Sequence, residues 1–321
     1  MSEAQLVARV RELFSPRIGD DAAVVDGQVL TTDMLVEDVD FTRAIPLRYI
    51  GRKSLAVNLS DLAAMGAAPS HALLALGIAD WARPGIDELL VAMAGMAKEY
   101  GIEIVGGDLS RAEKLTIAVT AIGRVVTRPL LRSGARPGDR IYLSRPVGGS
   151  ATGLALLQKG WTIDDGPASF GYAERELALS AIRRHVDPEP EVALGQKLAA
   201  ITEVTACIDV SDGLSTDLHH LCDASGYGAQ IECERIPMFP DLMSSAHRLG
   251  VRAQEVVLHG GEEYALLFTS SLPESQMSTR VGRPVYAFGR MTREQGVLLL
   301  ENGASRRLDA GGFDHFTQTP H

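Results

Sequence analysis

The chain has 321 residues, of which 45% are hydrophobic, and a formal net charge of -10 at pH 7. Because single cores rarely keep growing past about 250 to 300 residues, this length favours two domains. No apolar run reaches the roughly 20 residues that cross a bilayer, and no signal peptide is evident, so we expect a cytoplasmic protein without a membrane partner. The negative charge disfavours nucleic acid as a partner, and an anionic substrate would need bound metal or a local basic group.

The three cysteines, Cys207, Cys222 and Cys233, are odd in number and lack CxxC spacing. This pattern argues against zinc sites and against a disulfide framework. We expect buried free thiols.

The chain opens with a predicted amphipathic helix near residues 2–14, followed by a hairpin. Asp26 and Gly27 suit the tight turn of that hairpin, since glycine tolerates positive φ. A plain turn explains Asp20 and Asp21 taken alone. Clustered carboxylate and hydroxyl oxygens would also suit a hard cation such as magnesium, and the hairpin would supply them from Asp20, Asp21, Thr31, Thr32 and Asp33.

A long helical pattern follows over residues 46–65, with Asn58 and Asp61 one turn apart. Burying Asp61 in so alanine- and leucine-rich a helix is costly unless the carboxylate is paired or bound to metal. Residues 72–78, 102–105 and 115–126 are predicted strands, and 84–100 is a predicted helix. The strand at 102–105 should end at Gly106-Gly107-Asp108, where the glycines let the backbone approach a ligand closely.

Turn-forming residues at 133–139 mark the predicted domain boundary, which gives domains 1–135 and 136–321. After it come a strand at 141–144 and a helix at 151–158. Gly148 and Gly149 can cradle a phosphate at that helix N-terminus, although a plain loop-to-helix turn is the simpler interpretation. There is no GxxxxGK[ST] motif, so a P-loop nucleotide fold is not supported.

Three more features complete the second half. A predicted strand at 205–210 has Asp209 near its end and is followed by Ser211 and Asp212. This is the strand-to-helix position where α/β proteins commonly bind ligands. A helix cap accounts for Ser211 or Asp212 alone. Gly260-Gly261-Glu262 precedes a predicted strand at 265–269, and 285–291 with 296–300 form a predicted strand pair.

Five separated acidic motifs in an already acidic chain are best explained by several divalent ions in one cleft. Such a cleft suits phosphoryl transfer, in which the protein positions donor and acceptor while metals neutralise phosphate oxygens. No GxSxG elbow, Ser-His-Asp order or reactive-cysteine context stands out. We therefore expect direct in-line transfer without a protein nucleophile.

Six segments that carry these motifs, in this order, resemble those of the thiamine-monophosphate kinase family: GDD at 19–21, TTD at 31–33, AVNLSDLAAMG at 56–66, GGD at 106–108, SDG at 211–213 and GGE at 260–262. The wider superfamily contains aminoimidazole ribonucleotide synthetase, selenophosphate synthetase and a hydrogenase maturation protein. The resemblance implies an α/β (α+β) fold of two domains, with an N-terminal sheet that pairs with its twin across a homodimer. It also implies ATP-dependent phosphorylation of thiamine phosphate to thiamine diphosphate, in thiamine diphosphate biosynthesis.

The resemblance further implies residue roles, carried over by position. Several Mg²⁺ ions would be bound by Asp21, Thr31, Thr32, Asp33, Asp61, Asp108, Asp209 and Asp212, of which Asp33, Asp61, Asp108 and Asp212 would be catalytic. ATP would meet Gly107, Asp108, Arg132 and Ser211. Thiamine phosphate would meet Glu262 and Phe313, although Phe313 can equally be a C-terminal core anchor.

One position departs from the family pattern, because Asp40 precedes Phe41 where the family commonly has a substrate-facing histidine. An ionised carboxylate repels a phosphate. Asp40 can bind a bridging cation, can turn away while Arg43 binds the phosphate with its planar fork, or can mark a different acceptor. We favour Arg43 as the compensating residue.

Rival interpretations differ at particular residues. Selenophosphate synthetases use a reactive cysteine or selenocysteine near the N-terminus, and this chain has no cysteine before Cys207. The hydrogenase maturation relatives end in a functional cysteine, whereas this chain ends Thr319-Pro320-His321. A non-catalytic protein that binds ATP or metal is a further alternative.

Overall fold

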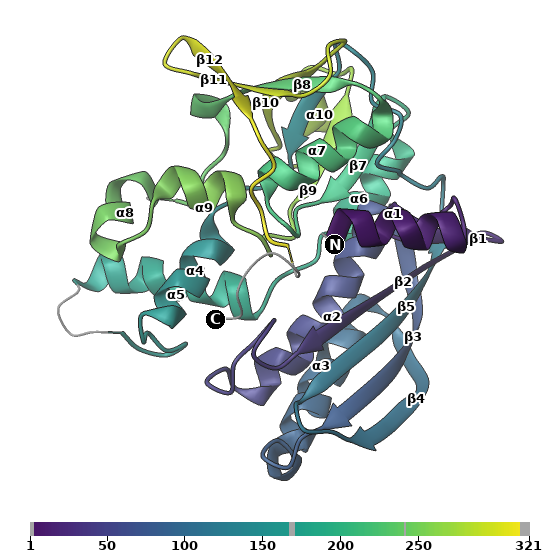
Figure 1. Ribbon diagram of the computed structural model, residues 1–321, viewed down its shortest axis with the longest axis vertical. Helices are drawn as coiled ribbons and strands as arrows, with labels where there is room; N and C mark the ends of the chain where they lie inside the picture. The colour runs from purple at the N-terminus through teal and green to yellow at the C-terminus, as the bar shows by residue number, and fades with distance from the viewer. Residues whose placement is uncertain (1–2, 167–170, 241, 315–321) are drawn as a thin grey trace. The chain divides into compact units, whose positions relative to one another are not determined.

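The computed structural model describes residues 3–166, 171–240 and 242–314, so the last seven residues lie outside it. The described chain forms two compact units (Figure 1). Unit 1 contains the residues up to Pro129, the segment Val186–Gln196 and Asp314, and unit 2 contains Leu130–His185 and Lys197–Phe313. The sequence-derived boundary at residue 135 stays a prediction. Within the described residues no helix combines the length and apolar character that a membrane crossing requires.

Unit 1 is built on a five-stranded sheet of order β1-β2-β5-β3-β4. Its strands are β1 (Ala23–Val25), β2 (Gln28–Val36), β3 (Ala67–Ile78), β4 (Glu103–Arg111) and β5 (Thr116–Val125). Only β3 and β4 run parallel; the other neighbours are antiparallel. Asp26 and Gly27 join β1 to β2 with φ values of 50° and 78°, so the predicted hairpin and its turn are confirmed.

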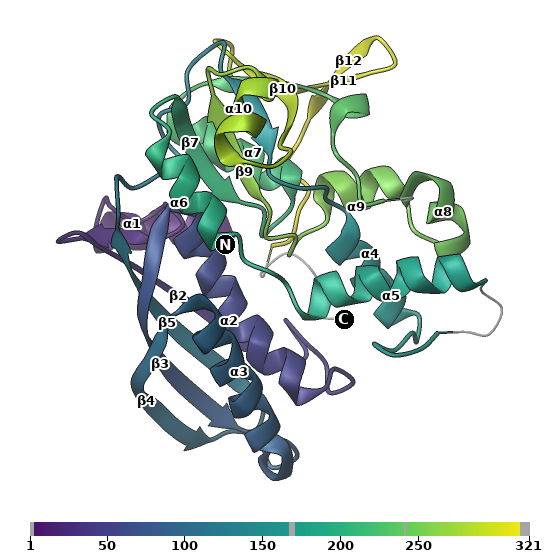
Figure 2. The same ribbon diagram turned by 180° about the vertical axis from the view of Figure 1, so that it is seen from behind.

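Helices α2 (Leu47–Ala64) and α3 (Ile86–Tyr100) cover one face of this sheet (Figures 1 and 2). Leu55, Leu59 and Leu62 of α2 are fully buried, as the apolar spacing predicts. The two helices pack closely because Gly51 lies against Leu89, where a Cβ would collide with the Leu89 carbonyl. Unit 1 also contains α1 (Glu3–Leu13) and the short helix η1 (Arg83–Gly85).

The segment Val186–Gln196 belongs to unit 1 although it follows more than fifty residues of unit 2. Arg52 Nε donates to Asp187 Oδ1 at 2.6 Å, and Gln196 Nε2 donates to the Ala67 carbonyl at 3.3 Å. The chain therefore passes from unit 2 back to unit 1 and out again, which a single cut in the sequence does not describe.

Unit 2 is built on a seven-stranded sheet of order β12-β11-β8-β10-β6-β9-β7. Its strands are β6 (Arg140–Leu143), β7 (Val204–Asp209), β8 (Gly228–Glu232), β9 (Leu266–Ser270), β10 (Tyr286–Thr292), β11 (Val297–Glu301) and β12 (Ala304–Leu308). The helices are α4 (Gly149–Gln158), α5 (Tyr172–Val186), α6 (Val192–Ala200), α7 (Leu214–Ser225), η2 (Cys233–Arg235), α8 (Leu242–Leu249), α9 (Ala253–His259) and α10 (Glu274–Val281). Helix α5 ends, and α6 begins, within the segment that belongs to unit 1.

Two sequence predictions about strands are wrong. The predicted pair at 285–291 and 296–300 is not a pair, because β8 lies between β10 and β11 and bonds to both. The predicted strand at 102–105 does not stop at the glycines, since β4 continues to Arg111. By contrast, Cys207, Cys222 and Cys233 are buried free thiols, as expected.

Candidate active site

The acidic hairpin and helix α2 meet within unit 1. Carboxylate oxygens of Asp21 and Asp61 lie within 4.8 Å of each other, and the Thr31 hydroxyl donates a hydrogen bond to Asp61 Oδ2. Asp21 is buried and Asp61 is half-buried. The structure thus brings together three of the residues predicted to bind metal, from β2, α2 and the segment before β1.

Asp33 adds a third carboxylate to this cluster. Its main-chain N–H donates to Asn58 Oδ1 at 3.1 Å, so the Asn58 side chain of α2 fixes β2 at this point. Burial, followed by the negative charges of Asp40 and Asp21, raises the pKa of Asp33 to about 6. Excess negative charge and an all-oxygen donor set are what a hard divalent cation neutralises, so these residues fit Mg²⁺.

The side chain of Thr32 faces away from this cluster. Its hydroxyl donates to the Val119 carbonyl at 3.2 Å and accepts from Thr120 at 3.1 Å. Thr32 is exposed on the open face of the sheet, whereas Thr31 on the helix-covered face is buried, because side chains alternate along a strand. A metal contact from Thr32 on the Asp33 side would have to use its main chain.

Asp108 does not join the cluster either. Asp33 pairs with Val119 on β5, Val119 with Leu74 on β3, and Leu74 with Gly107 on β4. This row covers three inter-strand spacings, about 14 Å. Asp108 is opposite Ala75, an exposed residue of the open face, whereas Asp33 belongs to the row of Val119 and Leu74 on the covered face. One copy of unit 1 therefore keeps Asp108 and Asp33 on opposite faces.

Asp40 and Arg43 lie on the turn after β2. Asp40 Oδ2 accepts a hydrogen bond from Val36 N at 2.7 Å, so one carboxylate oxygen is turned to the backbone. Asp40 is nonetheless close enough to Asp33 to raise its pKa. The Arg43 side chain is 59% exposed and its Nε donates to the buried Glu37.

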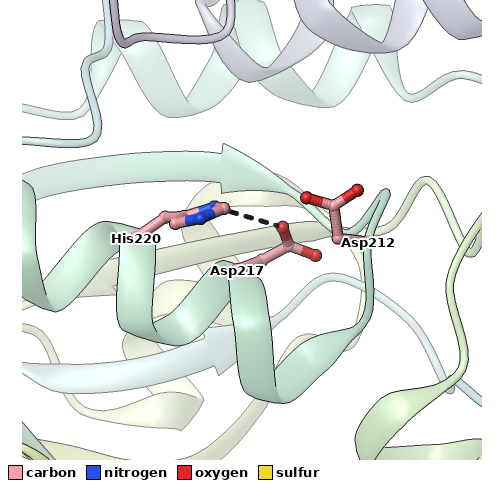
Figure 3. A group of neighbouring side chains, drawn as sticks. All are labelled: Asp212, Asp217 and His220. Carbon is pink, nitrogen blue, oxygen red and sulfur yellow. Dashed lines mark ion pairs between the residues drawn. The ribbon is translucent and has the colours of Figure 1, made fainter. Parts of the chain in front are cut away.

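In unit 2, a second acidic group surrounds the start of α7 (Figure 3). Ligand atoms of Asp212, Asp217 and His220 lie within 4.8 Å of one another. Asp217 Oδ2 accepts from Gly213 N at 3.0 Å, and its other oxygen lies 3.8 Å from His220 Nδ1. Burial, followed by the charges of Asp212 and Asp209, raises the pKa of Asp217 well above its usual value. These groups can hold a cation.

The same surroundings that raise the pKa of Asp217 lower the pKa of His220. Burial, followed by the positive charge of Arg132, lowers the pKa of His220 to about 4. Our sequence analysis missed Asp217 and His220. Their i, i+3 spacing one turn into a helix after SDG is the signal that could have found them.

Main-chain hydrogen bonds gather the remaining predicted residues of unit 2. Glu262 N donates to the Ser211 carbonyl at 2.7 Å, and Phe313 N donates to the Asp212 carbonyl at 3.0 Å. Arg132 is fixed through its carbonyl, which accepts from Ser225 Oγ at 3.2 Å. Ser211, Asp212, Glu262 and Phe313 therefore lie together around one loop.

Glu262 adopts a positive φ of 58°, which is unusual for a residue other than glycine. Its Oε2 lies 3.2 Å from Nδ1 of the buried His185, and Ser150 Oγ is 3.2 Å from the same nitrogen. Sequence reasoning missed His185, since it lies 77 positions away and in no motif. This pairing fixes the carboxylate predicted to meet substrate.

The neighbouring carboxylate, Glu263, occupies the N-terminus of α4. Its Oε1 accepts from Gly148 N and Ser150 N, each at 2.9 Å. The orphan amides of that helix are thus satisfied by a protein side chain. Gly148 and Gly149 belong to a capped loop-to-helix turn and not to an open phosphate cradle.

Comparison with known proteins identifies the family of this chain. Residues 19–125 match the AIR synthase related protein, N-terminal domain, and residues 136–283 match the corresponding C-terminal domain. Thiamine-monophosphate kinase from Escherichia coli O157:H7 is 35% identical over 312 residues, which cover 93% of this chain and 91% of that protein. The enzyme of Bacillus subtilis is 33% identical, with 93% of each chain covered. The chain belongs to the thiamine-monophosphate kinase family.

Solved structures place the fold in the same family. The structure described as AaThiL complexed with AMPPCP and TMP has a TM-score of 0.86 and 30% identity, covering 98% of this chain and 97% of the other. A HypE–HypF complex reaches a TM-score of 0.77 at only 20% identity, which shows a shared fold alone. The two-domain α/β fold expected from the resemblance is confirmed.

Proposed function

We infer that the protein transfers a phosphoryl group from ATP to thiamine phosphate and so forms thiamine diphosphate. The observation that carries this conclusion is the pair of acidic groups, one in each unit, each of which contains residues of the family's motifs, in a chain with a thiamine-monophosphate kinase relative at 35% identity. AaThiL, which matches over nearly the whole chain, has been solved with the ATP analogue AMPPCP and with TMP. ATP is therefore the co-substrate and thiamine phosphate the acceptor.

We propose that several Mg²⁺ ions are bound during the reaction. In unit 1 they would be held by Asp21, Asp33 and Asp61, with Thr31 and the main chain of Thr32. Asp108, on the opposite face of the sheet, would bind metal across a dimer. In unit 2 they would be held by Asp209 and Asp212. Bound magnesium would supply positive charge that neutralises phosphate oxygens.

The remaining site residues orient the two substrates. Gly107, Asp108, Arg132 and Ser211 would contact ATP, while Asp40, Arg43, Glu262 and Phe313 would contact thiamine phosphate. The aromatic ring of Phe313 suits a cationic ring. The motifs include no activated side-chain nucleophile, which supports in-line attack by an oxygen of the acceptor phosphate.

We also propose that the protein works as a homodimer joined through the open face and the edges of the unit 1 sheet. That side carries Thr32 and Asp108, and large apolar side chains there and along the β4 edge are exposed: Met34, Leu73, Val105 and Leu109. Contiguous exposed apolar surface is typical of an interface. Strand β4 is an edge strand, and β1 covers the outer edge of β2 only as far as Leu30. With the β4 edge of the partner beside β2, Asp108 of the partner subunit would supply the carboxylate that the chain's own Asp108 cannot bring to Asp33. We place the dimer in the cytoplasm, where free thiols are usual.

The test is a coupled assay of purified protein with ATP, magnesium and a panel of acceptors. Thiamine phosphate should be phosphorylated in preference to free thiamine, selenide and carbamoyl compounds. Binding of ATP without turnover of any acceptor would favour a non-catalytic protein instead. A phosphorylated side chain trapped in a single-turnover quench would exclude the in-line mechanism.

A further inference from the structure

Glu37 is a charged side chain that is completely buried in unit 1. Its Oε2 accepts from Trp81 Nε1 at 2.9 Å and from Leu115 N at 2.8 Å, and its Oε1 accepts from Arg43 Nε. Its own N–H donates to the Leu115 carbonyl at 3.0 Å. Burying a carboxylate is expensive unless donors surround it, and here three donors from separate parts of the chain do so.

The network holds the turn that carries Asp40 and Arg43. Asp38 has a φ of 66° and its N–H donates to the Phe41 carbonyl at 2.8 Å, while Asp40 closes the turn onto Val36. The Glu37 side chain ties this turn to Leu115 at the start of β5, and the half-exposed pair of Lys114 with Asp38 at 3.2 Å adds a second tie.

The same network orients Arg43. Its guanidinium carbon lies 5.3 Å from the centre of the Trp81 ring, and both side chains line a pocket of about 670 Å³. Asp80, Arg111, Ala112 and Glu113 also line it, and Arg111 is paired there with Asp80, so Arg43 is the arginine of this pocket whose Nη groups we consider for an anion. Glu37 accepts the hydrogen bond of Nε, on the side of the guanidinium that faces the interior of unit 1. A planar guanidinium held at Nε presents its two Nη groups as a fork for an anion.

We propose that Glu37 is a positioning residue for the acceptor substrate, which fixes the Arg43 guanidinium against Trp81 so that its outer edge can bind the acceptor phosphate. This inference rests on the proposed function and on the role proposed there for Arg43. Glu37 itself contacts no substrate. It acts through the geometry of Arg43, so its loss should change acceptor binding more than the chemical step.

Glu37→Gln is the decisive variant, because its amide oxygen can still accept from Trp81 and Leu115 while its NH2 group faces Arg43 Nε. Two donors then oppose each other and Arg43 is released. We expect the KM for thiamine phosphate to rise about tenfold or more, as for loss of a charge-assisted hydrogen bond. The KM for ATP and kcat should stay within about twofold.

Matched variants separate this effect from a general structural one. Glu88→Gln breaks another Arg–Glu pair of unit 1, the exposed pair with Arg48 at 3.0 Å, and should leave every kinetic constant unchanged. Trp81→Phe removes one donor to Glu37 but keeps an aromatic ring under Arg43, and should raise the KM for thiamine phosphate less than Glu37→Gln does.

A double-mutant cycle tests whether Glu37 acts through Arg43. Arg43→Ala should raise the KM for thiamine phosphate, and Glu37→Gln should add nothing in that background. An unchanged KM in Glu37→Gln, or an equal further increase in the Arg43→Ala background, would overturn the proposal. If the parental protein does not phosphorylate thiamine phosphate at all, the proposed function fails. If the parental protein is active and Glu37→Gln leaves the KM for thiamine phosphate unchanged, only the positioning role of Glu37 is refuted.

Discussion

Asp33 and Asp108 lie on strands at separate positions of one sheet and belong to opposite faces of it. Two strands, β5 and β3, intervene between them, and the register sets Asp33 in the row of buried Val119 while Asp108 lies opposite exposed Ala75. Two residues that the family motif assigns to the same chemistry therefore cannot serve one ion from the same copy of unit 1. In the proposed dimer, Asp108 of the partner subunit would lie beside Asp33 in place of the chain's own Asp108.

We predict that Asp33→Asn and Asp108→Asn are each inactive alone but complement each other. After mixed refolding, half of the dimers would contain both chains, and each such dimer would have one intact site. About a quarter of the parental activity should return. A mixture of Asp33→Asn with Asp61→Asn is the control. It should stay inactive, because Asp33 and Asp61 of each site come from the same chain and every site then has one of the two changes. Recovery in the control, or none in the test mixture, would contradict the shared site.

Asp61→Asn should abolish turnover while leaving the fold intact, and so should Asp33→Asn. Each removes a charge that would hold metal in the proposed site, and loss of a metal clamp costs several kcal/mol of transition-state stabilisation. Initial rates at saturating magnesium and melting curves measure the two effects separately. Near-parental activity in either variant would remove that residue from the set of ligands.

The sequence could predict those parts of the site that depend on local pattern. Asp26-Gly27 predicts its hairpin because both positions need positive φ. Asn58 and Asp61 share a face of α2 because they are one turn apart, and there they meet Asp33 and Thr31. Strand alternation also could have separated Thr32 from its neighbours, although our residue assignment did not use it.

The parts that depend on distant pairing could not be predicted. Asp108 was expected at a strand end, yet β4 continues past it and lies at the far edge of the sheet, which only the pairing with β3 decides. Glu263 caps a helix that begins more than a hundred residues earlier. His185 and Glu37 likewise gain their roles from contacts across the fold, and no motif marks either of them.

Asp40→Asn should improve acceptor binding. The amide oxygen can still accept from Val36 N, so the turn is kept, which a histidine would not guarantee. Removing the charge relieves a repulsion with the acceptor phosphate of about 1 kcal/mol at partly screened range, and the KM for thiamine phosphate should fall about fivefold. Steady-state kinetics with the acceptor varied measure this. A higher KM, or loss of activity, would mean that Asp40 is itself a ligand.

Glu263→Gln should change how stability depends on pH. Burial is the main cause that raises the pKa of Glu263 from 4.5 to about 7, against the opposing charges of Arg145 and Arg184. The folded state therefore holds this proton more tightly than the unfolded state does. The resulting stabilisation is complete below about pH 4.5 and is lost as the pH rises through about 7.

The amide side chain introduced by Glu263→Gln cannot titrate, and its oxygen can still accept from Gly148 and Ser150. The difference in unfolding free energy between variant and parent should therefore shift in favour of the variant between pH 5 and pH 8, by up to about 3 kcal/mol. Denaturant unfolding across this range measures the shift. Glu232→Gln, at a side chain 46% exposed in the same unit, controls for loss of a charge. Parallel curves for parent and Glu263→Gln would show that the buried carboxyl is ionised throughout, because the backbone donors and arginines then outweigh burial.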